Sequence, residues 1–300
     1  MEFRTLRAFV EVVRQGGFSH AAKTVFATQS TVSKAVKQLE EELGAPLLDR
    51  IGHKVRLTAF GEIVYPRAVR LLTERSDLLA ELEELRGLKR GTLRIGLPPV
   101  GSSRIFAPLL ARYRSAYPDI DVQLAEHGGD RLADLVRGGE LELAATVYPE
   151  ESEFEFLDVR REPLVALLAC DHPLAGAGAI DLGALRHEPF ILFAEGFAIS
   201  RMIMDGCLRH GFEPVIAARS SEVQFLIELA AARLGIAFLP RLLAEQADAR
   251  RVSAVLLAEP NTEWRLAMIW RRGAFLSHAA RAWLEMLRSA VHRADYSERD

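Results

Sequence analysis

The sequence contains very little cysteine: two residues, Cys170 and Cys207, in a chain of 300. Two cysteines are too few for a disulfide framework or a cysteine-based metal cluster, so a reducing compartment is the simpler expectation. The chain also lacks any run of about 18 uncharged apolar residues. Its N-terminus lacks the apolar core of a secretory signal. We therefore expect a cytoplasmic protein that has no membrane span.

Motifs of the common catalytic sites are also missing. The chain contains no Walker loop, no Gly-x-Gly-x-x-Gly and no His-Glu-x-x-His. Cys170, Asp171 and His172 are neighbours in sequence, and such neighbours do not converge as nucleophile, base and orienting group must, so we interpret them as a turn. The sequence thus predicts neither an enzyme nor a bound cofactor or metal. We expect Cys170 and Cys207 to be buried apolar side chains, and a redox role for either stays open.

Charge is nearly balanced over the whole chain, with 38 Lys and Arg against 41 Asp and Glu. Residues 1–60 hold nine basic and six acidic residues, a net of +3, which leaves −6 for the remainder. The length fits two or three domains, and a hydrophobic content of 49% fits a folded chain. The sign of this asymmetry favours an N-terminal module that meets nucleic acid.

Residues 1–43 show the periodicity of three short helices. A pair of glycines ends the first of them. We expect Ser19 to cap the second helix and Thr28 to cap the third, with Gly44 as the C-terminal stop of the third. Residues 47–57 are expected to follow as a tight β-ribbon with a basic tip.

The third helix has two contrasting faces. Its apolar stripe is Val32, Val36, Leu39 and Leu43. The opposite face offers Gln29, Ser30, Ser33, Lys34 and Lys37. Gln can bridge an adenine edge as donor and acceptor, Ser can bond bases or phosphates, and Lys pairs with phosphate. This face suits a recognition helix in a DNA major groove, and an ordinary solvated helix face is the alternative.

Residues 59–88 are expected to form one long helix. Its apolar residues alternate steps of four and three, as in a coiled coil: Val64, Ala68, Leu71, Leu78, Leu82 and Leu85. A helix of about 30 residues spans about 45 Å, which is longer than most domain helices. We therefore favour a helix that joins two copies of the chain over a core-facing helix of one domain. Arg75 interrupts the series once and would set the register.

From residue 92 onward, strand patterns alternate with amphipathic helices. Strands are expected at 93–97, 121–125, 141–147, 164–169, 190–193, 215–218, 236–239 and 265–270. Helices are expected around 104–116, 130–137, 199–210, 223–233 and 277–290. The last residues, 295–300, are expected to be a frayed tail. Strand–helix alternation of this kind predicts α/β layers with largely parallel sheets.

Several sequence blocks occur in a fixed order. Among them are Gly17-Phe18-Ser19-His20-Ala21-Ala22, Gln29-Ser30-Thr31-Val32-Ser33-Lys34 and Leu57-Thr58-Ala59-Phe60-Gly61. Together they resemble the winged helix-turn-helix of the LysR-type transcriptional regulators. Later blocks resemble the effector domain of that family, such as His172-Pro173-Leu174 and Leu234-Gly235-Ile236-Ala237-Phe238-Leu239-Pro240. Leu48, Ala59 and Ser30 stand where the family often has Phe, Pro and Pro, and Ser30 would alter the operator preference.

The resemblance implies an α/β multidomain chain. Residues 1–58 would be an N-terminal winged helix-turn-helix DNA-binding domain, and 59–90 a long dimerising linker helix. Residues 91–300 would be a two-lobed α/β effector-binding domain of the periplasmic-binding-protein type, with lobe one at 91–162 plus 266–300 and lobe two at 163–265. The implied partners are double-stranded operator DNA, a small-molecule effector such as a small organic acid or an aromatic compound, and further copies in a homodimer or homotetramer.

The predicted site residues fall into two sets. The DNA-binding set is Gln29, Ser30, Thr31, Ser33, Lys34, Lys37, Arg50 and Lys54. The effector-binding set is Pro99, Val100, Gly101, Ser102, Ser103, Gly129, Val147 and Phe197. In the second set, a helix start after the first strand offers N–H groups and Ser102 a polar anchor, although a plain helix cap is the alternative. Some relatives have Arg where Val147 stands, so we expect a small, fairly apolar pocket rather than one for a strongly anionic effector.

Two other classes of protein remain open from the sequence. A solute-binding protein used in transport would share the two-lobed fold but would need export. A DNA-binding domain fused to an enzyme would share the first 58 residues, and a detected reaction product would reveal it.

Overall fold

The computed structural model describes residues 1–51, 54–85, 91–147 and 153–297. Contacts divide the chain into two compact units. The N-terminal unit comprises Met1–Lys89 with Arg137–Leu141 and Phe275–Ser277. The C-terminal unit comprises Arg90–Val136, Glu142–Ala274 and His278–Asp300.

The N-terminal unit begins with three helices, as predicted: α1 (Phe3–Arg14), α2 (Phe18–Thr24) and α3 (Gln29–Leu43). The prediction that Thr28 caps α3 is confirmed, because its hydroxyl accepts a hydrogen bond from the Thr31 N–H at 3.2 Å. Gly44 ends α3 with a left-handed φ of 72°. The second helix is present as predicted, but the prediction that Ser19 caps it is wrong, because the helix begins at Phe18 and Gly17 is at the N-cap. Ser19 lies inside the first turn and donates instead to Gln29 Oε1 at 3.1 Å.

A hairpin and a long helix complete this unit. Strands β1 (Leu48–Ile51) and β2 (Lys54–Leu57) pair antiparallel, with Leu48 opposite Leu57. Helix α4 (Ala59–Leu85) follows, and the expected continuation to residue 88 lies outside the described residues. The core of the unit joins the apolar faces of α1, α2, α3 and the start of α4. The Arg75 guanidinium lies over the Phe3 ring of its own chain, 5.5 Å from the centroid, and its role in setting the register between two copies stays a prediction.

The C-terminal unit holds one ten-stranded mixed sheet with helices on its faces. Its first lobe contains β3 (Gly91–Leu97), β4 (Ile120–Glu126) and β5 (Leu143–Val147), with α5 (Ser102–Ile105), α6 (Ala107–Ala116) and α7 (Gly129–Gly138). Strand β3 lies between β4 and β5 and is parallel to both. The carboxyl ends of these strands therefore meet at one edge, where ligands collect in open α/β sheets.

The second lobe repeats the pattern. It contains β7 (Ala179–Ile180), the 3₁₀ turn η1 (Gly183–Leu185), β8 (Phe190–Phe193), α8 (Ala198–Arg209), β9 (Ile216–Ser220), α9 (Val223–Ala231), β10 (Ile236–Pro240), α10 (Arg241–Ala244) and β11 (Val252–Leu257). Strand β8 is parallel to β9 and β10. The strand β11 was not predicted, because its alternating burial gives only a short pattern.

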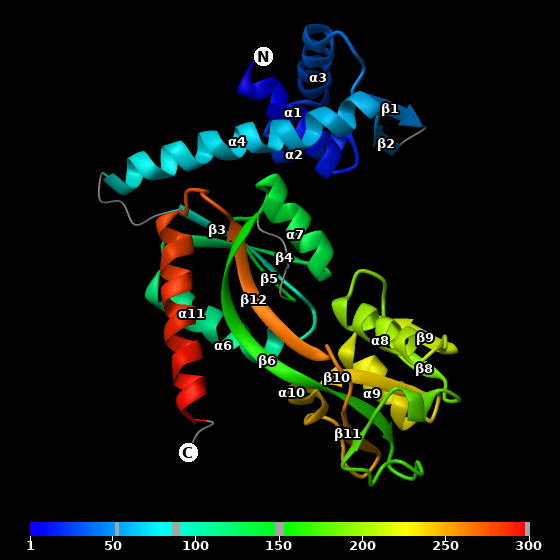
Figure 1. Ribbon diagram of the computed structural model, residues 1–300. Helices are drawn as coiled ribbons and strands as arrows, with labels where there is room; N and C mark the ends of the chain where they lie inside the picture. Colours follow the sequence, from blue (N-terminus) through cyan, green and yellow to red (C-terminus); the bar gives the residue numbers. More distant parts are fainter. Residues whose placement is uncertain (52–53, 86–90, 148–152, 298–300) are drawn as a thin grey trace. The chain divides into compact units, whose positions relative to one another are not determined.

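Two long strands cross between the lobes. Strand β6 (Phe154–Ala169) pairs with β12 (Glu263–Arg271) over its first part and with β10 and β11 over its last part. Figure 1 shows β6 and β12 running side by side through this unit. These crossing pairs are antiparallel, so the expectation of largely parallel sheets holds only inside each lobe. The predicted strand at 164–169 is therefore the end of a much longer one.

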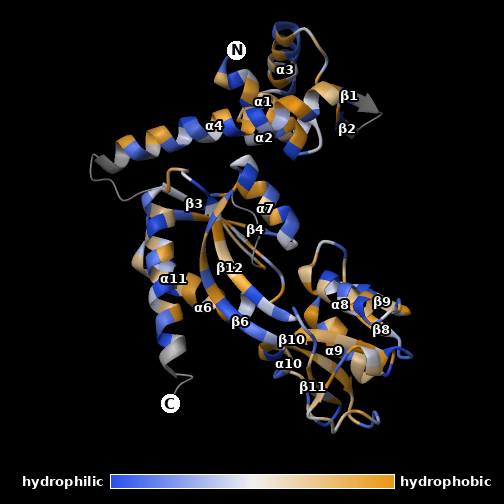
Figure 2. Cartoon of the chain, in the orientation of Figure 1, coloured by the Kyte–Doolittle hydropathy of each residue, from blue (hydrophilic) through white to orange (hydrophobic). Residues whose placement is uncertain are grey.

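The last helix, α11 (His278–Ser297), packs on the first lobe. The Tyr113 hydroxyl donates to Ala279 O at 2.8 Å, and the ring meets Trp283 edge-on at 5.4 Å. Helix α11 extends past the expected end at 290, so the tail predicted from 295 is helical through Ser297. Figure 2 shows the apolar residues concentrated on the central strands, with both kinds of residue along α4. No helix in the described ranges is long and apolar enough to cross a bilayer.

Candidate functional site

Helix α3 presents a polar face to solvent. The residues Gln29, Ser30, Lys34 and Lys37 are exposed, and Ser33 is half-buried. At 3.6 residues per turn these five lie within one side of the helix, opposite buried Val32, Ala35, Val36 and Leu39. The structure thus brings five predicted DNA-binding residues onto one face.

Local contacts fix the amino-terminal end of that face. Gln29 Oε1 accepts from Ser19, which leaves the amide NH₂ of Gln29 outside that bond. The Thr28 hydroxyl lies 2.9 Å from Ser30 Oγ and 2.8 Å from Thr31 Oγ1. Lys37 pairs with Glu41 at 3.4 Å one turn further along, and both side chains are well exposed. An exposed pair of this kind exchanges readily for a phosphate partner because water screens it.

Three residues of the predicted DNA-binding set lie off this face or outside the described side chains. Thr31 is exposed but turns away and lines a groove of about 550 Å³ bounded by α1, α3 and α4. Arg50 is in β1 and Lys54 is in β2, at the ends of the hairpin. Their side chains are not among the described ones, and the predicted basic tip at residues 52–53 also lies outside the described residues.

The predicted effector-binding residues separate into two neighbouring cavities in the C-terminal unit. The smaller, of about 50 Å³, is lined by Val100, Gly129, Val147 and Phe197 from the predicted set, and by Pro98, Asp130, Thr146, Ala198, Ile199, Arg201, Trp264 and Leu266. The larger, of about 500 Å³, is lined by the predicted Pro99, Gly101 and Ser103, and by Glu126, Ser221, Glu222, Val223, Gln224, Leu243 and Gln246. Both cavities take residues from both lobes.

The structure brings Ser102 to the lining of neither cavity, contrary to its expected role as polar anchor. Its hydroxyl donates to Pro98 O, which closes the loop on itself. The helix behind it, α5, has only four residues, so its dipole is small. Gly101, by contrast, is required locally: it has a φ of 89°, and a Cβ there would lie 3.0 Å from the Trp264 ring. The loop therefore contributes Gly101, and not the Ser102 hydroxyl, to the lining of the larger cavity.

Two charged residues of the smaller cavity were missed from the sequence. Asp130 lies in the first turn of α7 and Arg201 in the first turns of α8, so they come from different lobes. The Arg201 guanidinium donates to both carboxylate oxygens of Asp130, one bond at 3.1 Å. The hydrogen bonds to Asp130 raise the pKa of Arg201. The two residues are 71 positions apart in the sequence, which explains why no local pattern pairs them.

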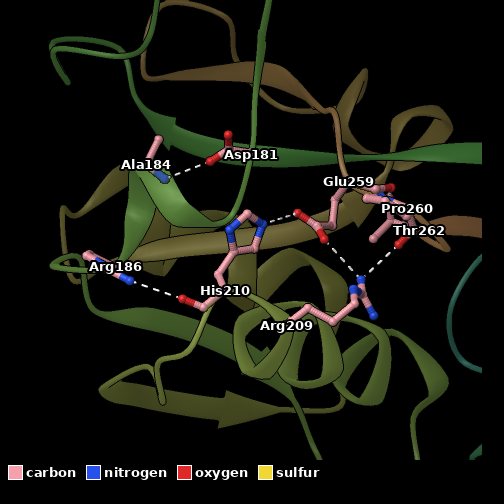
Figure 3. A network of polar contacts seen from close by, with 8 residues as sticks. All are labelled: Asp181, Ala184, Arg186, Arg209, His210, Glu259, Pro260 and Thr262. Carbon is pink, nitrogen blue, oxygen red and sulfur yellow. Dashed lines mark hydrogen bonds and ion pairs between the residues drawn. The ribbon is translucent and has the colours of Figure 1, made fainter.

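A buried polar network holds the segment that leads into β12 (Figure 3). Glu259, whose side chain is 2% exposed, accepts from Arg209 at 3.0 Å and lies 2.8 Å from His210 Nε2. Arg209 also donates to Pro260 O at 2.9 Å. Burial opposes ionisation of Glu259, but the hydrogen bonds from His210 and Arg209 outweigh it and hold the pKa of Glu259 below its ordinary value. The network thereby positions the strand that supplies Trp264 and Leu266 to the smaller cavity.

The two cysteines differ from each other. Cys207 is buried in α8, as expected, and burial raises the pKa of its thiol to about 11. The expectation for Cys170 is wrong, because this residue is exposed. Strand β6 ends at Ala169, so Cys170 has already left the sheet and lies in a turn. Neither cysteine lines either cavity.

Comparison with known proteins agrees with both parts of this arrangement. Residues 3–62 match the family described as "Bacterial regulatory helix-turn-helix protein, lysR family", and residues 86–291 match the "LysR substrate binding domain". The uncharacterized HTH-type transcriptional regulator YwbI of Bacillus subtilis (strain 168) is 37% identical over 290 residues, covering 96% of each chain.

Two solved structures share the fold. A variant of full-length OxyR from Pseudomonas aeruginosa matches with a TM-score of 0.74 at 24% identity, over 97% of this chain and 94% of that one. Full-length CbnR in complex with its target DNA matches with a TM-score of 0.65 at 22% identity, over 96% of this chain and 99% of that one. The family matches together span most of the sequence. The chain therefore belongs to the LysR family of transcriptional regulators, which join a DNA-binding helix-turn-helix to an effector-binding domain.

Proposed function

We propose that the exposed face of α3 reads operator DNA, with Gln29, Ser30 and Ser33 at base edges. Lys34 and Lys37 would hold phosphates, as would Arg50 and Lys54 of the hairpin. One observation carries the proposal: these α3 residues share one solvent-facing side of a helix whose N-terminus is capped and whose other side is buried. The similarity to CbnR, whose structure contains target DNA, supports it.

Paired substitutions on α3 test the proposal. An operator would first be selected from random duplexes with the full-length protein. Gln29→Ala should reduce the preference for that operator over scrambled DNA by about five- to 150-fold, because a bidentate base contact contributes about 1–3 kcal/mol. Lys34→Ala should weaken binding to both duplexes equally and lower the salt slope by about one. An equal loss on both duplexes for Gln29→Ala would remove Gln29 from the base-reading set.

The boundaries that fit this reading are 1–58 for DNA binding, 59–90 for dimerisation and 91–300 for effector binding. Helix α4 supports the second of these. Phe60, Leu71, Leu78 and Leu82 are exposed large apolar residues on one side of α4, with exposures of 42–58%. Such a stripe favours burial against a second copy of the chain, and two copies place two α3 helices on two half-sites.

We further propose that an effector in the cleft between the two lobes changes their angle and so alters operator binding. Catalysis has no part in this reading, and the protein would act in the cytoplasm. Footprints of the selected operator with and without a bound effector test the coupling. An identical footprint and an unchanged affinity would contradict it.

A further inference from the structure

A bidentate ion pair beside the smaller cavity links the two lobes across the cleft. Asp130 belongs to α7, which follows β4, and Arg201 belongs to α8, which follows β8. The two nitrogen atoms of the guanidinium meet the two carboxylate oxygens. This is the planar geometry with which an arginine binds any carboxylate, whether from the protein or from a ligand.

The cavity beside this pair has the lining of a binding site for a compact apolar body. Side chains of Val100, Val147, Phe197, Trp264 and Leu266 surround it. Among the described residues that line it, Arg201 is the one cation and Asp130 the one anion. Its volume of about 50 Å³ limits the present space to a few small atoms. An acidic ligand that enters would find the cation already occupied by a carboxylate from the opposite lobe.

Exchange of that carboxylate is easy on physical grounds. The side chains of Arg201 and Asp130 are 58% and 54% exposed, so water screens their attraction and the pair contributes little stability. A ligand carboxylate offers Arg201 the same two bonds. Its apolar body would in addition cover the walls of the cavity, which the Asp130 carboxylate does not do. The exchange thus gains the burial of apolar surface at no loss of hydrogen bonds to Arg201.

We propose that Asp130 occupies the place of a ligand carboxylate, and that the effector is a small monocarboxylate with a compact apolar body that takes Arg201 from Asp130. The inference rests on the proposed function, because it takes this cleft to be the effector site. Displacement of Asp130 unties α7 from α8, so ligand binding and lobe movement become one event. A single cation favours one carboxylate over a phosphate dianion, whose second charge would face Asp130 without a partner. Arg201 thereby supplies the positive charge that some relatives have as an Arg at the position of Val147.

Matched probes test this on the full-length protein. Isobutyrate and its neutral analogue isobutyramide would be titrated by calorimetry. Wild-type protein should bind isobutyrate about tenfold more tightly than isobutyramide, since hydrogen bonds to a charged group are the stronger ones. Arg201→Gln should make the two affinities equal, and Arg201→Lys should keep part of the preference because it retains charge without the planar fork. Asp130→Asn should tighten isobutyrate severalfold and leave isobutyramide unchanged, because it removes the competitor.

The chain offers a matched control. Arg104 of α5 pairs with Glu245 at 3.3 Å and donates to Leu242 O, so it also ties the lobes, yet it does not line the smaller cavity. Arg104→Gln should keep the preference for isobutyrate.

Three results would overturn the inference: equal affinities of the two probes for wild type, weaker isobutyrate binding by Asp130→Asn, or loss of preference in Arg104→Gln. Wild-type affinity for the selected operator is measured separately. If the protein binds the operator but does not prefer isobutyrate to isobutyramide, this inference is wrong and the proposed DNA-binding function stands. If the protein prefers isobutyrate but bound isobutyrate leaves the affinity for the operator unchanged, the exchange at Arg201 is supported and the control of operator binding by the effector is contradicted.

Discussion

At the scale of single residues, Glu259 contributes to how the C-terminal unit responds to acid. A carboxylate whose pKa is lowered in the folded state stabilises that state above its ordinary pKa of about 4.3, and the contribution is lost as the pH falls through the lowered value. Glu259→Gln should therefore lower the stability at pH 7 by about 1.5 kcal/mol, because it weakens the hydrogen bonds from Arg209 and His210 by removing the charge that accepts them. The difference in the free energy of unfolding between wild type and Glu259→Gln should become smaller as the pH falls toward 3.5.

Tryptophan fluorescence in urea suits this measurement, since Trp264, Trp270 and Trp283 all belong to the C-terminal unit. If the difference in the free energy of unfolding between the two proteins stays constant from pH 7 to pH 3.5, the charge of Glu259 does not contribute to stability.

The two thiols should react differently. Cys170 is exposed, whereas Cys207 is buried and its pKa is raised to about 11. A thiol-specific disulfide reagent at neutral pH should modify one thiol in the native chain and two after denaturation, because the thiolate is the reacting form. Cys170→Ser should abolish the native reaction. Fast modification of Cys207 in that variant would contradict its burial.

Residue-scale prediction from sequence worked where the cause is local. The Thr28 cap and the face of Gln29, Lys34 and Lys37 follow from helix periodicity and capping, which need only a few neighbouring residues. The pair of Asp130 and Arg201 could not be predicted, because the fold alone brings together residues 71 positions apart. The domain boundaries and the DNA- and effector-binding sets remain predictions.

At the scale of elements, α3 depends on its first turn. Thr28→Ala removes the acceptor of the Thr31 N–H and should destabilise the helix start by about 1 kcal/mol. Amide exchange in the first turn of α3 should then be about fivefold faster, because that energy is about a factor of five in the opening equilibrium. Thr28→Ser keeps the hydroxyl and is the matched control. Equal exchange rates in all three proteins would show that the cap is dispensable.

Strand β6 shows where element prediction from sequence fails. Its first part contains Glu155, Asp158, Arg160, Arg161 and Glu162, which give no apolar run. These residues form a strand because β12, about a hundred positions later, pairs with them. Local propensity identified only the buried end at 164–169, where both neighbouring strands cover it.

At the scale of the whole molecule, the exposed stripe of α4 makes assembly sensitive to a single charge. Leu78→Glu places a carboxylate within the stripe, and burial of an unpaired charge is costly, so the oligomer should dissociate. Sedimentation velocity should then show a monomer with weaker operator binding. Ser76→Glu adds the same charge two residues away, on the opposite side of α4, and should leave the assembly intact. Dissociation of the oligomer by both variants, or by neither, would contradict the proposal that this stripe of α4 joins two copies of the chain.

The path of the chain through the C-terminal unit has a consequence for synthesis on the ribosome. Strand β5 is made early, yet its neighbour β12 and the helix that covers Tyr113 are made only after the whole second lobe. A nascent chain that has emerged only through Leu257 therefore exposes the unpaired edges of β5 and of the first part of β6, together with an uncovered aromatic surface. Such edges promote aggregation, so we expect the nascent chain to need protection by a chaperone until β12 and α11 have emerged.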